Sequence, residues 1–218
     1  MRSMRNYIVE MLGTFFLVLV VLLTGNPLAI GAMLIALVYM GGHISGAHYN
    51  PAVTLALIIR KNIGLKQASL YMLFQVTGSI LGAFTYFSLH NKTMAPMPNP
   101  NFTSSEFLII EVLFTFILAM VVLNVATSEK IAGNSFYGLA IGLTVTAAAY
   151  AGGPISGGAF NPAVGLGPII VDAIKGGDSI NNLWIYLLGP FAGGAIAGLL
   201  YNILELDVKE GKDLEDLE

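Results

Sequence analysis

The sequence contains no cysteine. It can therefore form no disulfide, and it offers neither a thiolate nucleophile nor a thiolate metal site. Charge is also scarce, because only 11% of the 218 residues are charged, whereas a soluble domain usually has about a quarter. So few charges cannot cover the surface of a globular domain. Together with a mean hydropathy of +0.76, this composition is that of a membrane protein.

Several function classes lack their characteristic residues. There is no nucleotide-binding glycine loop, catalytic triad or pair of acids, so we expect neither an enzyme nor a cofactor. Three histidines without cysteine make a metal site unexpected. No basic patch with interleaved aromatic residues is present, which argues against a nucleic-acid partner. The acidic residues gather at 207–218, which we interpret as a solvated cytoplasmic tail.

Six apolar stretches are long enough to cross a membrane. A hydrocarbon core of about 30 Å needs about 20 mostly apolar residues as a helix. The stretches cover residues 7–23, 27–40 and onward, 68–89, 107–125, 136–151 and 183–204. Two more, 51–60 and 162–174, are too short, because ten helical residues rise only about 15 Å.

Each short stretch begins with proline directly after asparagine. Proline favours the first helical turn, and asparagine favours the cap before it. Each stretch also follows a Gly/Ser-rich segment, 41–46 or 152–158. We predict two re-entrant segments that run extended to the middle of the membrane and return as half-helices. Non-helical backbone at that depth is tolerated only where it is buried or lines water, so this pattern indicates a pore.

The chain is an internal repeat. Ile-Ser-Gly-x-x-x-Asn-Pro-Ala-Val occurs at 44–53 and at 155–164, and Glu-x-Leu-x-Thr-Phe-x-Leu occurs at 10–17 and at 111–118. Each half holds three spans and one half-helix. Since three is odd, the second half enters the membrane from the opposite side, which is an inverted repeat. We expect one transmembrane domain over 1–206, with repeats at about 1–90 and 104–206, followed by the tail.

Basic residues predict the orientation. With the N-terminus inside, the cytoplasmic side holds Arg2, Arg5, Arg60, Lys61, Lys66, Lys130, Lys209 and Lys212, and the other side holds Lys92 and Lys175. This bias places both termini in the cytoplasm.

The inverted half-helices bring Asn50 and Asn161 together near the membrane centre. Their positive dipole ends repel a cation there. Each amide offers N–H donors to a passing molecule, and a water that accepts both bonds points its own hydrogens away, which breaks a proton chain. The extended segments expose carbonyl groups that replace part of the hydration of a neutral solute. These carbonyls belong to Gly46, Ala47, His48, Gly157, Gly158 and Ala159.

Glu10 and Glu111 are acids well inside predicted spans. Such a carboxylate is a functional candidate by default, and a proton relay is one interpretation. Because each acid has a partner in the repeat, we favour a supporting role in which each accepts backbone N–H bonds from a re-entrant segment. We expect Gln75 to bond to loop backbone and His43 to pack within its loop.

Residues 43–54, His-Ile-Ser-Gly-Ala-His-Tyr-Asn-Pro-Ala-Val-Thr, resemble the first signature loop of the aquaporin, or major intrinsic protein, family. The triplet Asn161-Pro162-Ala163 resembles the second, as Asn50-Pro51-Ala52 does within the first loop. The resemblance covers nearly the whole chain. It implies an all-α membrane fold of six spans and two half-helices. It also implies a homotetramer in the lipid bilayer with one passive pore per subunit for water and small neutral solutes.

The resemblance also places a selectivity filter at Ile30, Ala149, Gly158 and Val164. The family usually has arginine where this chain has Val164, and water-selective members commonly have histidine at Ala149 and an aromatic residue at Ile30. The filter is therefore expected to be wide and apolar, and to pass glycerol, urea or ammonia besides water. Glycerol-type members usually have aspartate at Gly165 and Pro-Leu at Tyr186-Leu187, so neither subclass fits.

Two alternatives remain. A secondary transporter also uses inverted repeats and broken helices, but it needs charged groups at the midplane, where this sequence offers asparagine and carbonyls. A structural junction protein of the same fold would have a closed pore.

Overall fold

The computed structural model describes residues 2–215, and the side chains of residues 4–205. Within this part of the chain there are helices and no strands. The α-helices are α1 (Arg2–Thr24), α2 (Pro27–Ser45), α3 (Pro51–Ile59), α4 (Leu65–His90), α5 (Ser104–Thr127), α6 (Tyr137–Ser156), α7 (Pro162–Ile174) and α8 (Leu183–Glu215). Short 3₁₀ turns, η1 (Glu129–Ile131) and η2 (Ser179–Asn182), precede α6 and α8.

Six of these helices are long and apolar enough to cross a membrane, and α3 and α7 are the two short ones. This confirms the predicted fold class. Local capping explains several of the boundaries. The Asn26 side chain accepts hydrogen bonds from the backbone N–H groups of Leu28 (2.9 Å) and Ala29 (3.2 Å), with Pro27 in the first turn. Thr103 and Glu106 form a capping box at the start of α5.

The Gly/Ser-rich segments differ from the prediction. Residues 41–46 and 152–158 were expected to be extended, but α2 continues to Ser45 and α6 to Ser156. Each helix ends only at the following glycine, Gly46 or Gly157, which adopts a left-handed conformation (φ 93° and 92°). Gly41 and Gly152 stay helical within these stretches and let aromatic rings pack closely, since a Cβ on Gly41 would collide with the Tyr49 hydroxyl. A Cβ on Gly152 would lie 2.9 Å from the Phe160 ring.

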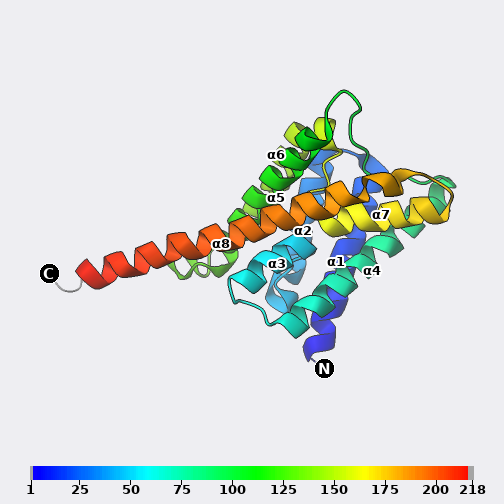
Figure 1. Cartoon of the computed structure of the whole chain (residues 1–218). Helices are drawn as coiled ribbons and strands as arrows, with labels where there is room; N and C mark the ends of the chain where they lie inside the picture. The colour runs from blue at the N-terminus through cyan, green and yellow to red at the C-terminus, as the bar shows by residue number, and fades with distance from the viewer. Residues whose placement is uncertain (1, 216–218) are drawn as a thin grey trace.

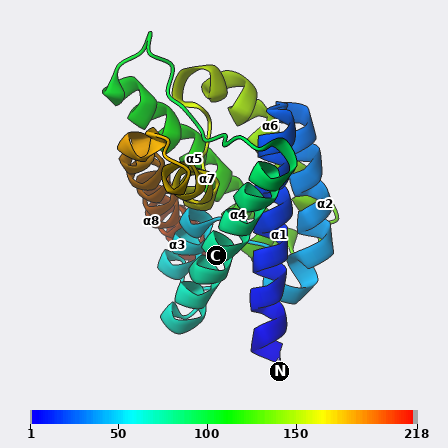
Figure 2. The same cartoon turned by 90° about the vertical axis from the view of Figure 1, so that its right-hand side faces the viewer.

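The two halves of the chain interlock. Among the spans, α1 packs against α4, α5 against α8, and α2 against α6, as Figures 1 and 2 show. Each half-helix packs on the third span of the opposite half, so that α3 lies against α8 and α7 against α4. Glycines at the crossings permit close backbone approach, and a Cβ on Gly193 would contact the Val112 carbonyl of α5.

Helix α8 continues well beyond the rest of the bundle (Figure 1). It ends at Glu215, so most of the segment interpreted as a tail continues span six as helix. Residues 216–218 lie outside the described residues.

Candidate functional site: a cavity between the two halves

A cavity of about 50 Å³ lies where the two re-entrant segments meet. A water molecule needs about 10–15 Å³ of such space, so the cavity has room for about three to five waters. Both candidate asparagines and all four candidate filter residues line it. These residues are Asn50, Asn161, Ile30, Ala149, Gly158 and Val164.

The cavity wall is mainly apolar. Leucine, isoleucine and valine side chains from α1, α2, α5 and α6 form most of it. The lining residues that have polar side chains are Asn50, Asn161, His48 and Tyr49, and the Tyr49 hydroxyl donates to the Leu37 carbonyl (2.9 Å). None of the described residues that line the cavity is an acid, a lysine or an arginine. The wall therefore offers a permeant few fixed partners.

Asn50 and Asn161 are joined reciprocally across the interface between the halves. The Asn50 side-chain nitrogen donates to the Phe160 carbonyl (3.0 Å), and that of Asn161 donates to the Tyr49 carbonyl (2.9 Å). Each side-chain oxygen caps its own half-helix, at the Ala52 N–H (2.8 Å) or the Ala163 N–H (2.9 Å). Each amide group has two hydrogens, so each asparagine retains one that it can donate to a molecule in the cavity.

The backbone before each asparagine adopts the same unusual conformation in both halves. Ala47 and Tyr49 have φ of 53° and 49°, and their repeat counterparts Gly158 and Phe160 have φ of 66° and 49°. Left-handed conformations are unfavourable for residues other than glycine and persist only where the surroundings enforce them. The two segments are thus built as a strained, matched pair.

Four of the six residues predicted to supply pore carbonyls line the cavity. These are Ala47 and His48 in the first half and Gly158 and Ala159 in the second. Gly46 and Gly157, which end the preceding helices, do not line it.

Glu10 binds the first re-entrant segment. It is fully buried, and its Oε1 accepts hydrogen bonds from the Ser45 hydroxyl (2.6 Å) and the His48 N–H (3.0 Å). Its Oε2 accepts from the Tyr49 N–H and the Gln75 side chain, both at 2.8 Å. Four donors surround one carboxylate, which compensates for burying its charge.

Glu111 binds the second segment in the same way with one donor fewer. Its Oε1 accepts from the Ser156 hydroxyl (2.7 Å) and the Ala159 N–H (3.0 Å), and its Oε2 accepts from the Phe160 N–H (2.7 Å). The partners of both carboxylates are hydroxyls, amides and backbone, rather than a second titratable side chain.

Two expectations for other side chains were wrong. Gln75 was expected to bond to loop backbone, but its nitrogen donates to Glu10 and to the Thr54 hydroxyl (3.1 Å). Its partners are side chains because α4 lies beside both α1 and α3. His43 was expected to pack within a loop, but it lies in the last turn of α2 and is exposed.

Thr54 is a site residue that sequence reasoning missed. Its hydroxyl donates to the Asn50 carbonyl (3.0 Å), and it therefore accepts from Gln75 and from His48 Nδ1 (3.0 Å). Its position four residues after Asn50, one helical turn away, was a usable signal. In the second half, Gly165 stands in its place, and a Cβ there would lie 2.5 Å from the Tyr186 Cβ.

The Phe160 ring is packed between helices of the second half. It packs against Phe114 of α5, with ring centroids 5.4 Å apart, and lies under Gly152 of α6. Val164, in the first turn of α7, and Ile30, in α2, therefore face the cavity together with Ala149 and Gly158.

Known proteins share both the sequence and the fold of this chain. The profile of the major intrinsic protein family matches residues 23–201. Probable aquaporin NIP4-2 of Arabidopsis thaliana is 34% identical over 96% of this chain and 78% of that protein. Nodulin-26 of Glycine max is 33% identical over 92% of this chain and 78% of that protein.

A bacterial relative and a solved structure complete the comparison. Glycerol uptake facilitator protein-like 6 of Lactiplantibacillus plantarum is 35% identical over 92% of this chain and 98% of that protein. The X-ray structure of the aquaglyceroporin from Plasmodium falciparum has the same fold, with a TM-score of 0.81 at 24% identity, and covers 91% of this chain and 95% of that chain. The family profile spans most of the sequence, and the fold agrees with it. The chain belongs to the major intrinsic protein family.

Proposed function

We propose that this chain is a passive pore that conducts water and at least one larger uncharged solute of the size of glycerol or urea, and that it excludes ions. As a member of this family, the chain is a multi-pass membrane channel for water and small solutes, and it is not an enzyme. The observation that supports the finer proposal is the cavity, whose four candidate filter residues are all uncharged.

Ion exclusion is assigned to the meeting point of the half-helices. Asn50 and Asn161 stand at the N-termini of α3 and α7, where the helix dipoles present partial positive charge. No described carboxylate lines the cavity to offset it. A cation that has lost its hydration is repelled there, and a water bonded to both amides is turned so that its hydrogens point away.

Solute passage is assigned to the filter. Val164, Ala149 and Gly158 are small and uncharged, and the Phe160 ring that could fill the space is engaged between α5 and α6. The name of one relative, glycerol uptake facilitator protein-like 6, agrees with this assignment. Ammonia, which is smaller than glycerol or urea, is expected to pass as well.

We further propose a homotetramer with one pore in each subunit. Large apolar side chains are exposed along the outer faces of the spans, where they can contact lipid or a neighbouring subunit. We also propose that residues 1–206 form one channel domain, that both termini are cytoplasmic, and that 207–218 extend into the cytoplasm.

A single experiment tests the proposal. Purified protein in liposomes is mixed in a stopped-flow instrument with a hyperosmotic solution of an impermeant solute, which reports water flux. It is then mixed in turn with hyperosmotic solutions of glycerol, urea and an ammonium salt. The proposal expects water flux above that of empty liposomes and glycerol or urea flux that rises linearly with the gradient. Flux that saturates or requires an ion gradient would indicate a transporter, and shrinkage no faster than in empty liposomes would indicate a closed structural protein.

A further inference from the structure

The first half-helix lies on a glycine face of α8. A Cβ on Gly194 would collide with the Ala52 carbonyl of α3, and a Cβ on Gly198 would lie 3.0 Å from the Ala56 carbonyl and 2.9 Å from the Ile59 Cβ. The two helices therefore touch backbone to backbone. Helices normally fix their relative position by packing side-chain ridges into grooves. A glycine face has no ridge, so this contact holds α3 close to α8 without fixing how far α3 slides along it.

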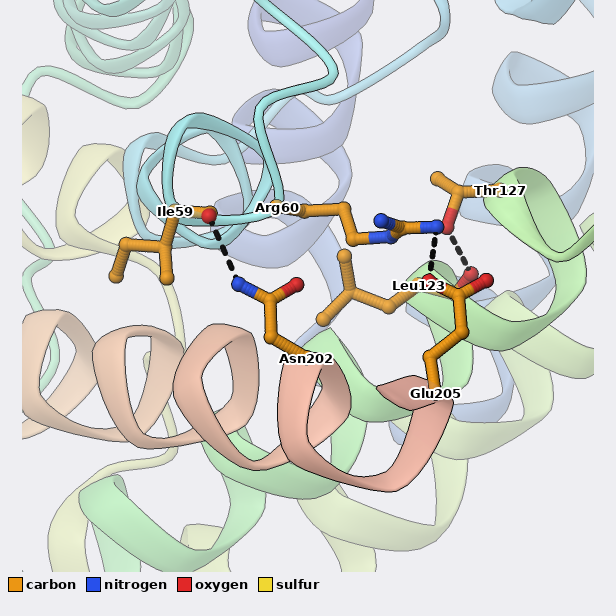
Figure 3. A network of polar contacts seen from close by, with 6 residues as sticks. All are labelled: Ile59, Arg60, Leu123, Thr127, Asn202 and Glu205. Atoms are coloured by element: carbon orange, nitrogen blue, oxygen red, sulfur yellow. Dashed lines mark hydrogen bonds and ion pairs between the residues drawn. The ribbon is translucent and has the colours of Figure 1, made fainter. Parts of the chain in front are cut away.

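Relative to α8, that position is fixed by polar contacts at the end of α3 far from the cavity. The bonds at the cavity end join α3 to other segments, Asn50 to Phe160 and Thr54 to Gln75 of α4. The Asn202 side-chain nitrogen of α8 donates to the Ile59 carbonyl (3.0 Å), one of the last carbonyls of α3. Arg60, the C-cap of α3, forms an ion pair with Glu205 of α8, as Figure 3 shows. Both side chains of the pair are about four-fifths buried. We call Arg60, Asn202 and Glu205 the polar lock.

Two further features strengthen the polar lock. The Arg60 guanidinium carbon lies 5.2 Å from the centroid of the Tyr201 ring of α8, and a cation is favoured at a helix C-terminus. Among the described side chains of residues 4–205, Arg60 and Glu205 form the only ion pair. Three contacts thus join the end of α3 to α8: Ile59 with Asn202, Arg60 with Glu205, and Arg60 with Tyr201.

The second half-helix is fixed differently. The Ser79 hydroxyl of α4 donates to the Ala163 carbonyl (2.5 Å), which ties α7 near its cavity end. The hydroxyls of Tyr71 in α4 and Tyr186 in α8 donate to the equivalent carbonyls of Ser45 and Ser156. When these two tyrosines are aligned, Ser79 corresponds to Gly194. The first half-helix, α3, therefore faces Gly194 at the place where the second half-helix, α7, faces the anchoring Ser79. At the far end of α7, Asp172 accepts a hydrogen bond from the Thr93 hydroxyl just after α4 (2.5 Å), and Lys175 lies over the Phe87 ring, but this end forms no ion pair with α4.

From this contrast we propose that Arg60, Asn202 and Glu205 are positioning residues that set the depth of Asn50 and Val53 in the pore. Helix α3 is a rigid rod of nine residues, capped by Asn50 at one end and by Arg60 at the other. An axial shift at Arg60 is transmitted to Asn50 and to Val53, which both line the cavity. The proposal rests on the proposed function, since it assumes that this cavity is the pore.

The internal repeat supplies a matched pair of reporters for a test. Because the chain has no cysteine, Val53→Cys on α3 and Val164→Cys on α7 each introduce a single thiol at the cavity wall. The lock is broken by Asn202→Leu with Glu205→Gln. The rate at which a small methanethiosulfonate modifies each thiol is followed by mass spectrometry on protein in liposomes.

We expect the modification rate of Val53→Cys to change about fivefold when the lock is broken. One net hydrogen bond contributes about 1 kcal/mol, and this energy shifts the equilibrium between two positions of α3 by about that factor. The rate for Val164→Cys should stay within about 1.5-fold, because its half-helix does not use the lock. Glu205→Gln alone should give a smaller change in the same direction. Exchanging the charges, Arg60→Glu with Glu205→Arg, should restore the parent rate, whereas Arg60→Glu alone should not.

An equal change at both reporters would show general loosening of the fold and would overturn the proposal, as would an unchanged rate at Val53→Cys. If the variant with the broken lock does not fold, Glu205→Gln alone and the charge exchange replace it. The rates of Val53→Cys and Val164→Cys are then compared in the same way. The rates are read by mass without any transport measurement. Failure of the lock is therefore distinguishable from failure of the proposed pore, which the liposome fluxes test separately.

Discussion

We propose that solute selectivity depends most on Val164. It stands in the first turn of α7 and faces the cavity beside Ala149 and Gly158. With valine, this position is wide and uncharged. An arginine would narrow it and add a positive charge. Selectivity in such a pore is a difference between the barriers for two permeants, so one side chain can change it without changing the fold.

The first prediction concerns this residue. Val164→Arg should lower glycerol or urea flux by about tenfold, equivalent to about 1.4 kcal/mol in the barrier, and water flux much less. The guanidinium fills the space and finds backbone carbonyls in its own segment. Stopped-flow light scattering on liposomes measures both fluxes. Val164→Leu is the size control without the charge. A parent protein that passes water but excludes glycerol, urea and ammonia would contradict the wide filter.

The second prediction concerns the asparagines. Asn50→Asp or Asn161→Asp removes the donor to the Phe160 or Tyr49 carbonyl and places a carboxylate oxygen against it. We expect lower water flux together with new cation leakage, because the carboxylate cancels the positive dipole ends. Leakage is measured with a potassium-sensitive dye in liposomes. Asn26→Asp is the matched control, since Asn26 also precedes proline and caps α2 through its oxygen alone. Asp variants with the ion exclusion and water flux of the parent would disprove the pore assignment.

At the scale of elements, the re-entrant segments depend on two buried acids. Glu10 and Glu111 each accept two backbone N–H bonds from residues just before the asparagines. These bonds hold Tyr49 and Phe160 in left-handed conformations that the residues would not adopt alone.

The third prediction follows from this geometry. Glu10→Gln and Glu111→Gln each leave at least one buried N–H without an acceptor, and we expect a loss of about 1–3 kcal/mol of stability for each. Thermal unfolding in detergent measures the loss. Glu106→Gln, in the exposed capping box, should be nearly neutral because glutamine also serves in such a box. Proton leakage should not fall in either variant. A marked fall would support the alternative that the two acids form a proton relay.

The sequence predicted the elements well where hydrophobic length and capping decide. The predicted half-helix 162–174 matches α7 to the residue, and 51–60 differs from α3 by one residue. The extended segments were predicted too long because glycine was interpreted as a helix breaker. In a bundle, Gly41 and Gly152 stay helical since a Cβ there would collide with Tyr49 or crowd Phe160.

Only the parts of the site that occur in both repeats could be predicted from the sequence. Matching Asn50 with Asn161 required the two motifs, and both residues line the cavity. The cross-bonds to Phe160 and Tyr49 join residues 110 and 112 positions apart, and they depend on how the halves dock. The role of Gln75 was missed for a similar reason, because its partners come from α1 and α3.

At the scale of the whole molecule, the orientation in the membrane gives the fourth prediction. Lys130→Cys and Lys92→Cys place single thiols at exposed positions in η1 and just after α4. In intact cells, a membrane-impermeant maleimide should label Lys92→Cys and leave Lys130→Cys unlabelled until the cells are opened. Labelling in the reverse order would place the termini outside.

The reciprocal bonds between Asn50 and Phe160 and between Asn161 and Tyr49 also bear on how the protein is made. During synthesis, the first half, residues 1–90, is complete about seventy residues before Asn161 leaves the ribosome. Until then the Tyr49 carbonyl has no such donor, and a bare carbonyl in hydrocarbon costs several kcal/mol. The first half must therefore stay hydrated or shielded by the insertion machinery until the second arrives. Neither half is a finished unit by itself, and separately expressed halves should become a channel only when they are made together.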